Sequence, residues 1–197
     1  MNLPNQLTVS RFVLTLVFLV ALFAEFPFHH TAALVVFIAA ALTDWMDGRI
    51  ARRRGLITNF GILMDPLADK ILTCSAFIAF VGQALIPAWM VVVIVARELA
   101  ITGLRLLAAS KHVVLAAEGL GKHKTASQVT TIIATLVFIS YPDWGVAGQA
   151  VFGSHWLFAR PWVCDFVWAS QWVAIILTFL SGWFYLWRNR ELFLRDM

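Results

Sequence analysis

The chain has 197 residues, of which 61% are hydrophobic and 13% are charged, and its formal net charge is +4. Soluble domains carry about 25% charged residues, so this composition excludes an ordinary soluble globule and predicts an integral membrane protein. The length suits a single domain over residues 1–197, and the positive charge does not indicate nucleic acid as a partner, because the basic residues are spread along the chain.

Six apolar stretches are long enough to cross a bilayer, which takes about 20 mostly apolar residues. They cover residues 7–24, 32–51, 62–81, 88–109, 125–140 and 166–187. The predicted fold is therefore an all-α integral membrane protein with six transmembrane helices. Residues 141–165 contain several glycines and aromatic residues, which indicate an outer loop with an interfacial helix.

The distribution of basic residues predicts the orientation of the six spans. An even number of spans puts both termini on one side of the membrane, and Lys and Arg are concentrated on the cytoplasmic side. Every Lys and Arg except Arg160 falls at the same ends of the predicted spans. Both termini and the short linker 52–60 are therefore expected to be cytoplasmic.

The first segment carries polar residues before its apolar run begins. Asn5, Thr8 and Arg11 recur at every third position, so they share one face of a helix. Taken by themselves, they are consistent with helix capping and an arginine that sets topology.

Four carboxylates lie close to the facing ends of the second and third spans. These are Asp44, Asp47, Asp65 and Asp69. At 100° per residue, one arc of about 140° on the helix surface contains Asp44 and Asp47 together with Gly48, Ala51 and Arg52. A carboxylate at this depth costs free energy unless it faces protein, water or a cation. Two neighbouring helices can therefore direct four carboxylates toward one another.

Like charges at this spacing repel, and divalent cations would allow them to remain ionised. Ligands that are all oxygen, without Cys or His, favour magnesium, manganese or calcium. The alternative is that Asp44 and Asp47 simply end a membrane helix at the water interface.

Basic residues in the fourth span and before the fifth form a second polar group. Arg97 and Arg105 are eight residues apart, hence close to one helix face, and buried arginines need anionic partners. Lys122 and Lys124 open the fifth span, where free backbone N–H groups and two ammonium groups would suit a phosphate. The alternative for these lysines is a snorkelling pair that sets topology, with a salt bridge to Glu98.

The acidic stretch resembles the signature of the CDP-alcohol phosphotransferases, D-x2-D-G-x2-A-R-x8-G-x3-D-x3-D, and every specified position is met. This resemblance implies two divalent cations, Mg²⁺ or Mn²⁺, as cofactors. It implies Asp44, Asp47 and Asp65 as metal ligands, with Asp69 completing the cluster and acting as general base. It also implies that Gly48, Ala51 and Arg52 contact the nucleotide.

Three further motifs resemble the phosphatidylglycerophosphate synthase subgroup of bacteria: P-N-x-L-T-x-x-R at the N-terminus, A-R-E...R in the fourth span and G-K-x-K-T before the fifth. The resemblance places Asn5 and Thr8 beside the nucleotide. It assigns the phosphate of sn-glycerol 3-phosphate to four residues: Arg97, Arg105, Lys122 and Lys124.

The same resemblance implies transfer of the phosphatidyl group from CDP-diacylglycerol to sn-glycerol 3-phosphate, giving phosphatidylglycerophosphate and CMP. It also implies a homodimer among membrane lipids, in a bacterial-type inner membrane, with its active site facing the cytoplasm.

Three other interpretations remain open. Within the family the acceptor could be inositol phosphate, serine or phosphatidylglycerol. A divalent-cation transporter would also carry acids on broken membrane helices, although the basic residues 52–54 would repel entering cations. A non-catalytic lipid-binding scaffold is the third.

Overall fold

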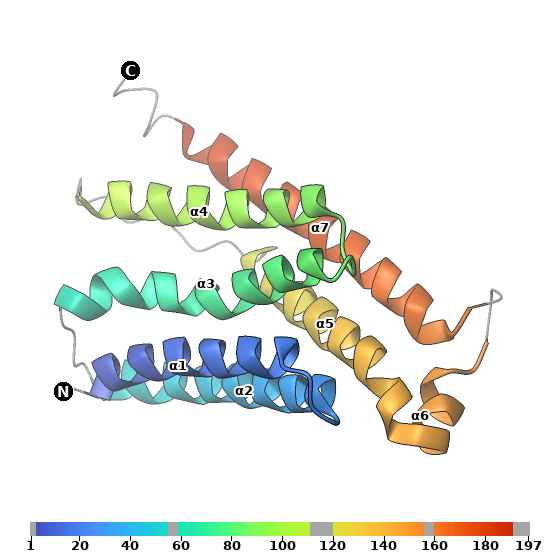
Figure 1. Ribbon diagram of the computed structural model, residues 1–197. Helices are drawn as coiled ribbons and strands as arrows, with labels where there is room; N and C mark the ends of the chain where they lie inside the picture. The colour runs from blue at the N-terminus through green and yellow to red at the C-terminus, as the bar shows by residue number, and fades with distance from the viewer. Residues whose placement is uncertain (1–2, 55–58, 111–119, 156–159, 191–197) are drawn as a thin grey trace.

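The structure is a computed structural model, shown as a ribbon in Figure 1. It describes residues 3–54, 59–110, 120–155 and 160–190, and the side chains of residues 9–43, 70–110, 121–155 and 160–190. Over these residues every regular element is a helix, as the sequence predicts.

Six long helices account for most of the chain. They are α1 (Leu3–Phe23), α2 (His29–Arg54), α3 (Asn59–Gly82), α4 (Ala88–Ser110), α5 (Leu120–Ser140) and α7 (Trp162–Arg188). Each contains most or all of one predicted span and ends within a few residues of it. The prediction that these six stretches are helical is therefore confirmed.

Prolines mark where two of these helices begin. α4 begins directly after Pro87, whose carbonyl accepts a hydrogen bond from the Met90 amide at 3.1 Å. α7 begins directly after Pro161. Proline has a fixed φ and no N–H to donate, so it fits the start of a helix, where the first N–H groups have no partner within the helix.

The described residues of the segment 141–165 fold against the rest of the protein. It forms a short 3-10 helix, η1 (Tyr141–Trp144), followed by α6 (Gly145–Phe152). The indole N–H of Trp144 donates to the hydroxyl of Thr31 at 2.9 Å, and that of Trp162 donates to the carbonyl of Val151 at 2.7 Å. The predicted short helix is present, and these two bonds tie the segment to the starts of α2 and α7.

Aromatic and aliphatic side chains from all six long helices form the main core. The rings of Phe18 and Phe37 lie 5.7 Å apart, and Phe77, Ile132 and Leu136 are fully buried in the same cluster. A smaller cluster joins α4 to α7. Because α1 and α5 each contact both α2 and α3, the two helices that carry the acidic residues share these two neighbours.

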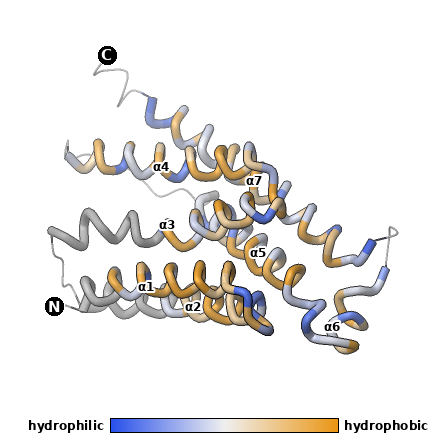
Figure 2. Tube along the Cα trace, in the orientation of Figure 1, coloured by the Kyte–Doolittle hydropathy of each residue, from blue (hydrophilic) through white to orange (hydrophobic). Residues whose placement is uncertain are grey.

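Large apolar side chains also lie on the outside of the helices. The hydropathy colouring in Figure 2 shows that hydrophobic residues recur along most of the coloured helices. Val20, Val92 and Trp168 are each at least 64% exposed. Apolar surface of this extent indicates contact with membrane rather than water. Among the described residues, two helical segments, Gly121–Phe152 and Trp162–Arg188, are long and apolar enough to cross a bilayer.

The helix ends gather at two opposite sides of the molecule. In Figure 1, α1 begins and α2 ends on the left-hand side, where α3 begins and α4 and α7 end. The turns α1–α2 and α3–α4 lie on the opposite side, with α6. The ends of α2 and α3 that carry the acidic motif are therefore on the same side as the first turn of α1.

Candidate functional site

The acidic motif lies on α2 and α3, but its side chains are outside the described residues. The same holds for the predicted nucleotide contacts. Nine predicted site residues are concerned: Asn5, Thr8, Asp44, Asp47, Gly48, Ala51, Arg52, Asp65 and Asp69. Among the side chains that are described, no three His, Cys, Asp or Glu residues come together as a metal site. The predicted donor set, four carboxylates, fits a hard cation such as Mg²⁺ or Mn²⁺.

Next to the acidic motif, a buried carboxylate gathers cations from three helices. Glu98 of α4 has a side chain that is 4% exposed. Its Oε1 accepts a hydrogen bond from Nζ of Lys124 on α5, and its Oε2 lies 3.0 Å from Nζ of Lys70 on α3. A guanidinium nitrogen of Arg97 lies 3.4 Å from Oε1. The described part of this cluster therefore has three cations and one anion.

Lys122 and Lys124 occupy the predicted position at the start of α5 but have different surroundings. Lys122 is exposed, whereas the side chain of Lys124 is 4% exposed and bonded to Glu98. The alternative interpretation from sequence included this salt bridge to Glu98, and the structure contains it. Lys122 is consequently the more accessible of the two ammonium groups to a phosphate arriving from water.

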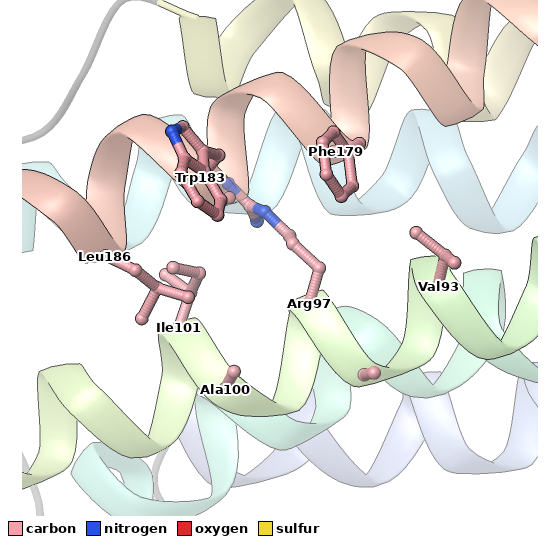
Figure 3. Close-up of a pocket in the computed structure, with 9 residues that line it drawn as sticks. Val93, Arg97, Ala100, Ile101, Phe179, Trp183 and Leu186 are labelled. Atoms are coloured by element: carbon pink, nitrogen blue, oxygen red, sulfur yellow. The ribbon is translucent and has the colours of Figure 1, made fainter.

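Arg97 reaches from α4 to α7. Figure 3 shows its side chain extending toward Trp183, and Gly182 leaves room for it, because a Cβ there would come within 2.8 Å of Arg97 Cγ. The arginine lies at a cavity of about 310 Å³ whose other lining residues, from Val93 to Leu186, are apolar. Its Nε is buried without a hydrogen-bond partner among the described residues. Arg97 thus connects an apolar groove with the Glu98 cluster.

Arg105 lies two turns further along α4 and is exposed. Its Nε donates to the hydroxyl of Tyr185 at 3.2 Å, and its guanidinium carbon lies 5.5 Å from the centre of that ring. Tyr185 is 2% exposed and so gives the arginine a rigid support. The face shared by Arg97 and Arg105 is the face that α4 turns toward α7.

Two residues of this region were not singled out as site residues from the sequence, Lys70 and Tyr185. The signal for Lys70 was its place in an apolar run directly after Asp69, since a membrane-depth lysine requires an anionic partner. No sequence pattern indicated Tyr185. It lies 80 residues from Arg105, and helical periodicity does not relate residues so far apart in the chain.

The profile of the CDP-alcohol phosphatidyltransferase family matches residues 1–180. The chain belongs to this family. It is 38% identical over 208 residues to the CDP-diacylglycerol–glycerol-3-phosphate 3-phosphatidyltransferase of Bacillus subtilis (strain 168), with 96% of each chain covered.

Two further relatives show the range of the similarity. A "probable phosphatidylglycerophosphate synthase" of Mycobacterium tuberculosis is 43% identical over 145 residues, which cover 72% of this CDP-alcohol phosphatidyltransferase and 68% of the relative. A "cardiolipin synthase (CMP-forming)" of Oryza sativa is 33% identical over 150 residues, covering 69% and 46% respectively. The similarity to the Bacillus protein extends over nearly the whole of both chains, whereas that to the plant protein covers less than half of the relative.

Proposed function

We propose that this CDP-alcohol phosphatidyltransferase transfers the phosphatidyl group of CDP-diacylglycerol to sn-glycerol 3-phosphate, yielding phosphatidylglycerophosphate and CMP. The observation that carries the proposal is the 38% identity to the Bacillus enzyme of that name over 96% of both chains. The complete acidic motif between residues 44 and 69 supports it. The reaction needs a site for a diphosphate, and these carboxylates would hold the divalent cations that neutralise it.

The acidic residues of α2 and α3 would hold two divalent cations, with Asp44, Asp47 and Asp65 as ligands and Asp69 completing the set. When bound, such cations neutralise a diphosphate and stabilise the charge on a departing phosphate oxygen. Asn5, Thr8, Gly48, Ala51 and Arg52 would contact the nucleotide, and the small residues among them let it approach the helix backbone.

The proposed bond changes include one proton transfer, and the family resemblance implies Asp69 as the proton acceptor. A hydroxyl oxygen of sn-glycerol 3-phosphate attacks the phosphorus that bears diacylglycerol, and the bond from that phosphorus to the oxygen bridging it to CMP breaks. Asp69 takes the hydroxyl proton as general base. CMP leaves with the bridging oxygen, so the acceptor oxygen replaces it on the same phosphorus.

The acceptor phosphate would be held by four basic residues of α4 and α5: Arg97, Arg105, Lys122 and Lys124. In support, Arg105 and Lys122 are exposed, and Arg105 donates a hydrogen bond to the hydroxyl of the buried Tyr185. Arginine suits phosphate because its planar guanidinium donates two parallel hydrogen bonds.

Replacing Lys122 with alanine is expected to raise the Michaelis constant for sn-glycerol 3-phosphate by about tenfold, because one charge-assisted hydrogen bond is lost. The constant for CDP-diacylglycerol should change by less than about twofold. Steady-state kinetics of the purified protein in mixed micelles measures both.

Arg160→Ala is the matched control, because Arg160 is an exposed basic residue at the opposite side of the protein and pairs with Asp165 at 3.6 Å. It should leave both constants unchanged. Equal increases in the two constants of Lys122→Ala would argue against a separate acceptor-phosphate pocket.

We further propose that six helices cross the inner membrane of a bacterial-type cell, with both termini and the active site on the cytoplasmic side, and that the protein is a homodimer. The common side on which α1 begins and α7 ends in Figure 1 is consistent with this topology. The lipid substrate would enter laterally between helices while the polar acceptor arrives from water.

A cysteine introduced for Thr58, in a variant that lacks Cys74 and Cys164, tests this orientation. It should react with a membrane-impermeant maleimide in inside-out vesicles and not in intact cells. Labelling of intact cells would place the α2–α3 connection outside and overturn the topology.

An acceptor panel tests the proposed reaction itself. Purified protein is incubated with radiolabelled CDP-diacylglycerol and, separately, sn-glycerol 3-phosphate, inositol phosphate, serine or phosphatidylglycerol. Only sn-glycerol 3-phosphate should yield a lipid product together with CMP. Preference for phosphatidylglycerol would reassign the chain to a cardiolipin synthase, the activity named in the plant relative. Metal flux across sealed vesicles without any transfer would indicate a transporter instead.

A further inference from the structure

Glu98 has no part in the proposed reaction, although it is the most heavily paired carboxylate among the described residues. Its side chain is 4% exposed, and it contacts Lys70 of α3, Arg97 of its own helix and Lys124 of α5. A lone carboxylate at this depth would be strongly unfavourable, so the three cations account for its burial. The contacts tie α3, α4 and α5 together at one point.

A buried ion pair of this kind contributes little net stability, because desolvation of the charges offsets most of their attraction. In some proteins such a pair instead fixes the mutual orientation of the groups that it joins. Lys70 directly follows Asp69 on α3, and Lys124 is two residues beyond Lys122 on α5. The carboxylate of Glu98 is therefore paired with the neighbour of the proposed base on one side, and with Arg97 and Lys124 of the proposed acceptor-phosphate site on the other.

We propose that Glu98 is a positioning residue for phosphatidyl transfer. Through Lys70 it holds the turn of α3 that carries Asp69, and through Lys124 it holds the start of α5 that carries Lys122. The base and the acceptor phosphate are thereby kept at a constant separation. This inference rests on the proposed function, since it acts through the residues assigned there.

Lys70→Gln is the sharpest variant, because it breaks the connection to α3 and leaves Glu98 paired with Lys124 and Arg97. We expect kcat to fall by about 10²-fold, the usual result of misplacing a catalytic group by about 1 Å. Both Michaelis constants should stay within about threefold of the wild-type values, because no substrate contact is removed. The unfolding temperature in detergent should stay within a few degrees of wild type.

Glu98→Gln should lower kcat at least as far as Lys70→Gln. The double variant should be no slower than Glu98→Gln alone, since both substitutions break the same contact and their effects are not additive. Asp165→Asn is the matched control: it neutralises an acid paired with Arg160 at the opposite side, and it should leave kcat unchanged.

An unchanged kcat in Lys70→Gln would overturn the proposal. So would a loss confined to the Michaelis constants, or losses that multiply in the double variant. Each variant is compared with wild type using whichever acceptor the wild-type protein prefers. A preference for another acceptor would refute the proposed substrate while still testing Glu98, whereas a wild-type protein inactive with every acceptor would overturn both.

Discussion

Asp69→Asn is expected to lower phosphatidyl transfer by about 10³-fold or more, because it removes the general base and a charge of the metal-binding set together. Asparagine has nearly the same size but does not accept the hydroxyl proton. Binding of CDP-diacylglycerol should largely survive, since three other carboxylates remain. Product formation in mixed micelles and binding of radiolabelled CDP-diacylglycerol to the same preparation measure the two effects.

Asp165→Asn provides the matched comparison, because it neutralises an acid at the start of α7, on the opposite side of the molecule. It should retain wild-type turnover. Unchanged turnover in Asp69→Asn would remove this residue as the base. Equal losses of turnover and lipid binding would show that Asp69 serves mainly to hold the substrate.

Removing divalent cations is expected to have the second large effect. Dialysis against EDTA should lower turnover to below about 1% of its initial value, because several kcal/mol of charge stabilisation at the diphosphate are lost. Addition of Mg²⁺ or Mn²⁺ should restore activity, and circular dichroism should show unchanged helix content throughout. Full activity in metal-free buffer, checked by elemental analysis, would contradict a cation-dependent reaction.

The long helices could be predicted from the sequence because their signal is local. A continuous apolar run of about 20 residues specifies a helix in a membrane, where every backbone polar group must be satisfied within its own segment. The helix start after Pro87 follows from the same local chemistry. Residues 141–165 gave only a general indication, because an eight-residue helix has too few turns to show a periodicity.

The arrangement of the basic residues could be predicted only in part. The spacing of Arg97 and Arg105 showed that they share a face, and the structure turns that face toward α7. The sequence did not distinguish between phosphate contact and a salt bridge for Lys122 and Lys124. The structure separates the two lysines, because burial of Lys124 against Glu98 depends on how α4 and α5 pack, which no local pattern specifies.

Crystals of the wild-type protein grown with CDP-diacylglycerol and Mn²⁺ test the central claim most directly, by anomalous scattering at a wavelength where manganese has a strong signal. The account predicts two manganese peaks bounded by Asp44, Asp47, Asp65 and Asp69 and in contact with the diphosphate. The absence of manganese from the ends of α2 and α3 that carry these aspartates, with the CDP-lipid bound elsewhere, would contradict it.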